Sequence, residues 1–151
     1  MYHIIVNPAS KSGRGQKIWD SLLPILAEKN VLYQAYFTTG AGHASQIADM
    51  LSCNLTTEPI TVIVLGGDGT INEVLQGLKN IPLITLGYIP TGSSNDLARD
   101  IGLSRNPMEA LLHILDNPKV KLMDLGIVQF KNGFFRKTKK PIYESDNAVR
   151  L

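Results

Sequence analysis

The chain has 151 residues, of which 44% are apolar and 19% are charged, a composition typical of one compact globular domain. Its longest apolar runs, such as residues 60–65, are too short to cross a bilayer, because a membrane-spanning helix needs about 20 residues. The lone cysteine, Cys53, excludes an internal disulfide, and the three histidines lack zinc-ligand spacing. Because the amino terminus has no features of a secretory signal, we expect a cytoplasmic protein.

Charge is distributed unevenly along the chain. Residues 1–130 carry 9 basic and 11 acidic side chains, whereas residues 131–151 carry 6 basic and 2 acidic ones. The periodicity of apolar residues also stops after Gln129. A basic, phenylalanine-containing segment could touch an anionic membrane or a nucleic acid, but more segments of this kind are solvated tails. We therefore interpret residues 129–151 as a basic tail and expect no nucleic-acid partner.

The first elements expected along the chain are a strand, a loop and a helix. Residues 2–6 are apolar and lead into an Asn-Pro pair, which predicts a buried strand that ends in a turn. Residues 9–15 are small and polar, as expected of a loop, and residues 16–29 have apolar side chains at helical spacing. Pro24 lies within that helix, so we expect a bend or a break near it.

The next elements lead to a turn rich in glycine. Residues 31–37 are rich in aromatic and β-branched side chains and predict a strand, and residues 43–51 predict a helix. Residues 60–65 are apolar with little alternation, which suits a strand that is covered on both faces. After the turn at residues 66–69, four apolar residues follow the pattern of an amphipathic helix: Ile71, Val74, Leu75 and Leu78.

The last third of the chain continues the alternation of strands and helices. Residues 83–89 predict a strand, residues 94–101 and 107–115 predict helices, and residues 120–128 are a final strand candidate. Such alternation at short spacing is typical of βαβ units with a mostly parallel sheet between helical layers. The sequence therefore predicts a three-layer α/β/α domain.

The strongest candidate site is the Gly-Gly-Asp-Gly-Thr run at residues 66–70, between the clearest strand and the clearest helix. Open α/β sheets bind ligands at the carboxyl ends of their strands, where glycines let backbone amides approach an anion closely. The carboxylate of Asp68 would repel phosphate there unless it held Mg²⁺, directly or through water, or accepted a hydrogen bond. The alternative is purely structural, since Thr70 and Glu73 have the spacing of a capping box.

Loops after the other strands carry similar residues. Residues 90–99 place hydroxyls, an amide and a glycine where they could bind phosphate or ribose. Alternatively, Ser93 and Asp96 form a capping box, and Arg99 is a surface residue instead of a phosphate partner. Residues 7–16 bring two cations to a loop that contains glycine but match neither a Walker A nor a dinucleotide-binding motif.

Four motifs follow one another in order: Asn7-Pro8 with Gly13-x-Gly15; Thr38-Thr39 with His43-Ala44; Gly66-Gly67-Asp68-Gly69-Thr70-x-Asn72-Glu73-Val74; and Pro90-x-Gly92-Ser93-x-Asn95-Asp96-x-Ala98-Arg99. In order and spacing they resemble the motifs of the diacylglycerol kinase catalytic-domain family, which includes bacterial diacylglycerol kinases and YegS-like lipid kinases. The resemblance extends over about residues 1–128. At Ser93 the family more often has threonine, so the hydroxyl is retained.

This resemblance implies an α/β lobe like those of NAD kinases and 6-phosphofructokinases. The implied reaction transfers the γ-phosphoryl group of ATP to diacylglycerol or a similar lipid hydroxyl, at a membrane surface. The residues implied to serve the nucleotide are Asn7, Thr39, Gly66, Gly67, Asp68, Gly69, Thr70, Asn72, Glu73, Gly92, Ser93 and Asn95. Asp68 is also the implied ligand of Mg²⁺, directly or through water.

The domain organisation departs from the family, whose members are longer and have a second, β-rich domain that supplies the other wall of the cleft. Residues 1–128 are interpreted as the ATP-binding lobe, and residues 129–151 as a truncated start of that second domain or a replacement for it. The general base is expected in the second domain, so we assign no catalytic residue. A homodimer is a further expectation, because uncovered apolar surface favours self-association.

Two alternatives to a lipid kinase are kept open. NAD kinases also have a Gly-Gly-Asp-Gly loop, but their Asn-Glu pair typically lies in a later motif, whereas here Asn72 and Glu73 follow the loop at once. The other alternative is a non-catalytic module or fragment that binds a nucleotide and transfers nothing.

Overall fold

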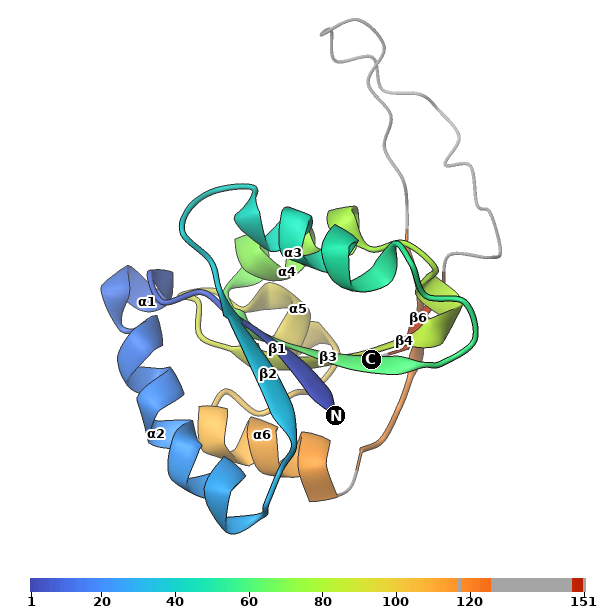
Figure 1. Cartoon of the computed structure of the whole chain (residues 1–151). Coiled ribbons are helices and arrows are strands. Elements are labelled where there is room, and N and C mark those ends of the chain that lie inside the picture. The colour runs from blue at the N-terminus through green and yellow to red at the C-terminus, as the bar shows by residue number, and fades with distance from the viewer. Residues whose placement is uncertain (117, 126–147, 151) are drawn as a thin grey trace, which may run out of the picture.

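The computed structural model describes residues 1–116, 118–125 and 148–150 and has a single mixed sheet at its centre (Figure 1). The strand order is β2-β1-β3-β4-β6-β5. Neighbouring strands are parallel except for the antiparallel pair of β5 and β6, so the predicted mostly parallel sheet is confirmed. The strands are β1 (Tyr2–Val6), β2 (Tyr33–Phe37), β3 (Ile60–Gly66), β4 (Ile84–Pro90), β5 (Leu122–Asp124) and β6 (Ala148–Arg150).

Helices cover both faces of this sheet and complete the three predicted layers. Figure 1 shows α3 (His43–Ser52) and α4 (Asp68–Gly77) together on one face, with α2 (Gly15–Glu28) and α6 (Pro107–Asp116) on the other. Shorter elements connect them: α1 (Ser10–Gly13), η1 (Ile81–Leu83) and α5 (Asp96–Asp100).

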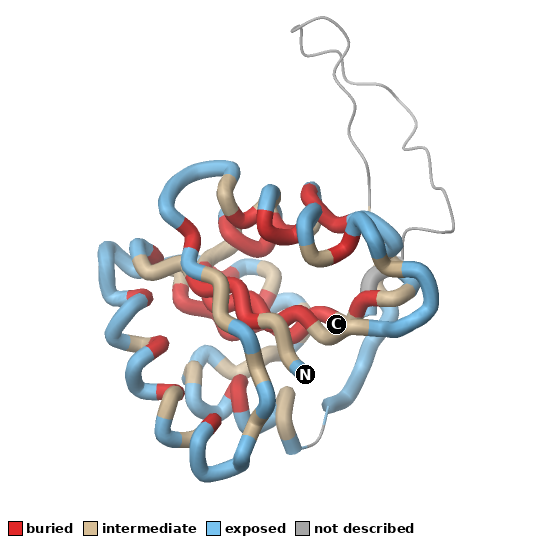
Figure 2. The backbone as a smooth tube through the Cα atoms, viewed as in Figure 1, coloured by how far each residue is buried: buried red, intermediate tan, exposed pale blue. Residues whose placement is uncertain are grey.

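Two apolar cores separate the layers, and the central strands are buried between them (Figure 2). Alternate residues of one strand serve different cores, as the two-residue period of a strand requires. Val62 and Val64 of β3 pack toward α3 and α4, whereas Ile63 and Leu65 pack toward α2 and α6. This double coverage explains why β3 reads as an almost continuous apolar run.

Pro24 lies within α2, which continues from Gly15 to Glu28, so the predicted helix is confirmed and of the expected bend or break the break is absent. The proline removes the amide that would bond to the carbonyl of Asp20, and its ring crowds that carbonyl. Both residues are exposed, so water can solvate the carbonyl. Burial of Trp19, Leu22 and Leu26 on the opposite side of the helix stabilises it against the core.

The segment after β1 is more ordered than the predicted loop. It forms the tight turn α1, in which Lys11 and Ser12 adopt left-handed backbone angles, with φ of 53° and 56°. Gly13 follows with φ of 85°, a conformation that glycine adopts without strain.

The carboxyl-terminal part of the chain was the least predictable. The final strand is shorter than expected, since β5 spans Leu122–Asp124, and residues 126–128 of the predicted strand lie outside the described residues. Ala148–Arg150, which we had assigned to a tail, instead forms β6 between β4 and β5. Residues 129–147 of the predicted tail also lie outside the described part of the chain.

Candidate functional site

The predicted site residues follow the carboxyl ends of four parallel strands. Because β1, β2, β3 and β4 run in the same direction, the segments after them meet at one edge of the sheet. Hydrogen bonds made by side chains tie three of these segments together, either to another side chain or to a backbone amide. The fourth segment, after β2, has local hydrogen bonds of its own. We refer to this region as the carboxyl edge.

The glycine turn after β3 opens directly into α4. Gly67 is the N-cap residue in an extended conformation, and no side chain caps the helix. The amides of Thr70 and Ile71 both donate to the carbonyl oxygen of Gly67, at 3.0 and 3.1 Å. Amides in the first turn of a helix have no acceptor within the helix, so those of Asp68 and Gly69 lie at a positive dipole end. The capping box predicted for Thr70 and Glu73 is wrong, because α4 begins two residues earlier.

Glycine is required at this turn by close packing. A Cβ atom added to Gly66 would lie 2.5 Å from Cβ of Thr70, which is closer than side-chain atoms can approach. A Cβ atom added to Gly92 would lie 2.8 Å from Cα of Gly67. The turns that follow β3 and β4 therefore contact each other backbone to backbone, with no room for a side chain between them.

Asp68 connects the same two turns through its carboxylate. Its Oδ2 accepts a hydrogen bond from the amide of Asp96 at 3.1 Å, and its Oδ1 accepts one from the amide of Leu97 at 3.4 Å. The carboxylate thus caps the first turn of α5 from the first residue of α4. This bears out the alternative in which Asp68 accepts hydrogen bonds. Each carboxylate oxygen still has a free lone pair.

Asn95 shapes the turn after β4 from within. Its Oδ1 accepts a hydrogen bond from the amide of Gly92 at 2.7 Å, and its Nδ2 donates to the carbonyl of the same residue at 2.9 Å. Asn95 is buried and is the N-cap residue of α5, with a left-handed φ of 51° and no side-chain cap. The capping box predicted for Ser93 and Asp96 is therefore wrong. Ser93 itself is exposed at the tip of the turn.

Two hydrogen bonds join the turn after β1 to the turns after β3 and β4. Nδ2 of Asn7 donates to Oγ1 of Thr70 at 2.8 Å, while Oδ1 of Asn7 accepts from the amide of Ala9 at 3.0 Å. The buried hydroxyls of Ser10 and Thr91 lie 2.8 Å apart. The hydroxyl of Thr70 thus accepts a hydrogen bond from Asn7, a role that the glycine motif did not predict.

The segment after β2 contributes Thr39. Its hydrogen-bond partner is His43, a residue to which the sequence analysis assigned no role. The amide of Thr39 donates to Nδ1 of His43 at 3.0 Å, and the Thr39 hydroxyl lies 3.0 Å from the same nitrogen. Because Nδ1 is an acceptor here, the proton of the neutral imidazole is on Nε2. The histidine thereby fixes the backbone and the hydroxyl of Thr39, which is exposed at this edge.

The remaining predicted residues lie on the outer surface of α4 and α5. Gly69 and Asn72 are exposed, and Glu73 is half-buried. Arg99 pairs with Asp96 at 3.1 Å and with Asp100 at 3.6 Å, and all three side chains are more than half exposed. Arg99 therefore fits the surface role that we kept as an alternative to a phosphate partner.

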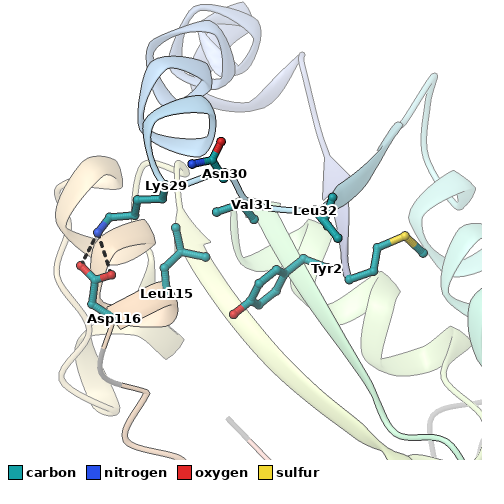
Figure 3. Close-up of a pocket in the computed structure, with 8 residues that line it drawn as sticks. Tyr2, Lys29, Asn30, Val31, Leu32, Leu115 and Asp116 are labelled. Atoms are coloured by element: carbon teal, nitrogen blue, oxygen red, sulfur yellow. Dashed lines mark hydrogen bonds and ion pairs between the residues drawn. The ribbon is translucent and has the colours of Figure 1, made fainter.

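One hollow of the surface lies away from these residues. It has a volume of about 500 Å³ and is lined by residues at the start of β1, the end of α2 and the end of α6, including Tyr2, Leu32 and Leu115 (Figure 3). The ion pair of Lys29 and Asp116 borders it, with a shortest N–O distance of 2.7 Å. These residues are at the opposite end of the strands, which we call the amino edge.

The described residues contain no group of three or more His, Cys, Asp or Glu side chains that could hold a metal ion. None of the helices within these residues is long and apolar enough to span a membrane.

The parallel strands, the glycine turn and the helix amides behind it make up an α/β lobe with polar turns gathered at one edge, an architecture that nucleotide-binding domains share. The family model of the diacylglycerol kinase catalytic domain matches residues 1–128. The chain therefore belongs to this family.

Known relatives agree with that assignment. The chain is 34% identical to the diacylglycerol kinase of Bacillus subtilis and 35% identical to sphingoid long-chain bases kinase 1 of Arabidopsis thaliana, over 83% and 84% of its length. A solved diacylglycerol kinase from Bacillus anthracis superposes on 82% of the chain with a TM-score of 0.67 and 31% identity. The matches span 41%, 18% and 44% of those three chains, respectively, so this chain is considerably shorter than its relatives.

Proposed function

We propose that this chain is the nucleotide-binding lobe of an ATP-dependent lipid kinase that phosphorylates diacylglycerol or a similar lipid hydroxyl. The observation that carries the proposal is the backbone contact between the turns after β3 and β4, beside the free amides at the start of α4. Together with the family membership, this geometry supports a site for the phosphates of ATP.

The residues at the carboxyl edge fit a phosphate chain. The amides of Asp68 and Gly69 are donors at a helix amino terminus, and Gly69 has open space around its Cα. An anion can approach this backbone closely because glycine presents no side chain. Gly66, Gly67, Asn72 and Glu73 belong to the same proposed site. Asn7, Thr70 and Asn95 support it by bonding to its backbone or to each other.

The same edge fits Mg²⁺ only with oxygen ligands from elsewhere. Asp68 is a single carboxylate, and Mg²⁺ is commonly held by one or two carboxylates together with waters and substrate phosphates. We propose that Asp68 serves the ion through a free lone pair while its bonds to Asp96 and Leu97 hold it in place. The bound ion would neutralise charge on the phosphates during transfer.

The chemistry proposed for the chain's own residues is binding and orientation. The amides beside Gly67 would hold the phosphates, and the hydroxyls of Thr39 and Ser93 would contact the nucleotide. Phosphoryl transfer also requires a group that accepts the proton of the lipid hydroxyl, and we assign none in this chain. A lipid substrate is met at a membrane surface, so we propose a cytoplasmic protein that works there, with a homodimer as its assembly.

A second candidate function is a module that binds a nucleotide and transfers nothing. Such a module would bind the nucleotide through the same free amides at the start of α4, without the proton acceptor that transfer requires and that we do not assign among the described residues. The family match, in turn, favours a lipid kinase over the NAD kinase alternative.

Calorimetry of Mg²⁺-ATP binding tests the proposal. We expect binding by the wild-type chain and its loss in Asp68→Ala, whereas Asp100→Asn, which changes a surface partner of Arg99, should bind normally. Thermal unfolding of each variant checks that the fold is retained. If the folded wild-type chain binds no nucleotide, the proposed nucleotide site is wrong for this chain. A transfer assay with diacylglycerol then separates a kinase from a binding module, because only a kinase forms the phosphorylated lipid.

A further inference from the structure

The described strands leave the outer side of β2 unpaired. β2 forms one edge of the sheet, and its register with β1 is continuous from Tyr33 to Phe37 (Figure 1). Edge strands of soluble proteins are usually protected from further pairing by charged side chains, prolines or β-bulges. β2 has no charged residue, no proline and no bulge. Its outer side therefore lacks the usual protection against another strand.

The direction of the backbone groups of β2 follows from two hydrogen bonds at its ends. The amide of Tyr2 donates to the carbonyl of Leu32 at 2.8 Å, and the amide of Thr38 donates to the carbonyl of Val6 at 2.9 Å. In a parallel pair, the N–H and C=O groups of alternate residues face the same neighbour, so the even-numbered residues of β2 face β1. The residues whose N–H and C=O groups face away from β1 are Tyr33, Ala35 and Phe37.

This arrangement is symmetric about Ala35. If a second copy of β2 lies antiparallel to the first, a twofold axis sets Ala35 opposite Ala35 of the second copy and Tyr33 opposite Phe37 of the second copy. Residues that face each other in this way exchange both of their backbone hydrogen bonds. Every outward N–H and C=O group of one strand then meets its complement in the other strand. An interface between identical surfaces requires such self-complementarity.

Side chains on one face of β2 complement the same pairing. Tyr33 and Phe37 both contact the buried ring of Trp19 edge to face, with centroid distances of 5.8 and 5.9 Å. Phe37 remains 40% exposed, so part of its ring is free to pack against another side chain. In the antiparallel pair it would lie opposite Tyr33 of the second copy, and cross-strand aromatic pairs stabilise sheets. The small side chain of Ala35 at the axis leaves room for close approach.

We propose that two copies of this chain associate through β2 and form one continuous sheet. The absence of charge favours a second copy, because identical charged strands would repel each other and a charged partner would find no opposite charge in β2. The inference rests on the homodimer of the proposed function and assigns its interface. None of the proposed nucleotide-binding residues lies within β2. A strand of 5 residues gives a small interface, so we expect a transient dimer.

Sedimentation velocity from about 10 µM to about 1 mM tests the proposal, since this range covers weak dissociation constants. We expect the wild-type chain to dimerise and Ala35→Pro to dimerise at least about tenfold more weakly, because proline removes an outward donor at the axis but no bond to β1. Gln34→Ala is the matched control. It removes an exposed side chain that donates to the outward carbonyl of Ala35 at 3.4 Å, so it should dimerise at least as tightly as the wild type.

A wild-type chain that stays monomeric at about 1 mM would overturn the interface. A dimer that Ala35→Pro leaves intact, or that Gln34→Ala abolishes, would overturn it as well. Thermal unfolding checks that each variant folds. Calorimetry of Mg²⁺-ATP binding to Ala35→Pro should match the wild type, so a failure of the dimer and a failure of the nucleotide site are seen separately.

Amide hydrogen exchange in the wild-type chain provides a test that needs no variant. As the concentration rises from about 50 µM to about 1 mM, NMR should show exchange at the amides of Ala35 and Phe37 slowed by at least about fivefold. The amides of Gln34 and Tyr36 face β1 and should not change. Equal slowing at all four amides, or slowing at none of them, contradicts pairing at the outer side of β2.

Discussion

The two ends of the sheet differ in where polar groups and open space are found. At the amino edge, a hollow of about 500 Å³ is lined by Tyr2, Leu32 and other residues that make few polar contacts, apart from the ion pair of Lys29 and Asp116. At the carboxyl edge, side-chain hydrogen bonds join turns that are far apart in sequence, such as Asn7 to Thr70. The hollow at the amino edge thus lies away from the hydrogen bonds that join distant turns.

This difference teaches how to recognise part of a binding site. At the carboxyl edge, side-chain hydrogen bonds join the turns to one another. Such bonds are a useful sign, because backbone groups that bind an anion must be in place before it arrives. The comparison predicts that changes at the carboxyl edge weaken nucleotide binding, some of them together with stability, whereas changes at the amino edge affect stability alone.

The largest effect is expected from Gly66→Ala. The added methyl group would overlap with the side chain of Thr70, which cannot move away because it is buried and accepts the hydrogen bond of Asn7. Overpacking of this kind costs about 1–3 kcal/mol in the free energy of unfolding. Urea denaturation measures the loss. Gly69→Ala is the matched control: it has open space, so it should unfold at the wild-type urea concentration but bind Mg²⁺-ATP more weakly.

A smaller loss is expected from Asn7→Ala, which removes both hydrogen bonds of that side chain. We expect a fall of about 1–2 kcal/mol in the free energy of unfolding, because Thr70 and the amide of Ala9 lose their partner. Calorimetry on the folded variant should also show weaker Mg²⁺-ATP binding. Binding at wild-type strength would contradict the view that these bonds organise the carboxyl edge.

The pH dependence of stability should report on His3, the second residue of β1. Burial lowers its pKa, and the positive amino terminus lowers it further. The unfolded chain binds a proton near pH 6.5, while folded His3 remains neutral until a lower pH. Stability is therefore complete above about pH 6.5 and falls as the pH drops through the folded pKa of His3. Urea midpoints at pH 8 and pH 5 measure this fall, which should be smaller in His3→Gln.

The smallest effect is expected from Lys29→Ala at the amino edge. Its ion pair with Asp116 is partly exposed and screened by solvent, so the free energy of unfolding should change by about 0.5 kcal/mol or less. Mg²⁺-ATP binding should equal that of the wild type. Weakened binding in this folded variant would show that the two edges are not as independent as the structure indicates.

The fold was predictable where a local pattern and tertiary packing agree. The strand at residues 2–6 was predicted at its observed bounds, and β3 was predicted to within one residue, because buried strands need apolar residues without interruption. Predictions failed where a distant partner decides the outcome. Ala148–Arg150, which the sequence predicts to be part of a tail, becomes a strand by pairing with β4 and β5.

The candidate site shows the same division. Sequence alone identified the turns after four strands and the importance of Asp68, because glycines and polar residues at strand ends have a recognisable spacing. It gave Thr70 and Ser93 capping roles as alternatives, and the structure assigns neither. It also gave His43 no role, although this residue accepts a hydrogen bond from the amide of Thr39.

The sequence by itself determined the family, the layered fold and which turns lie at the carboxyl edge. These properties depend on local residue patterns and on the order of motifs, which are read directly from the chain. Only the tertiary structure decided that Asp68 caps α5 and that Gly67 contacts Gly92. These contacts join residues that are 20 or more positions apart, and no local pattern of residues specifies which distant groups the folded backbone brings together.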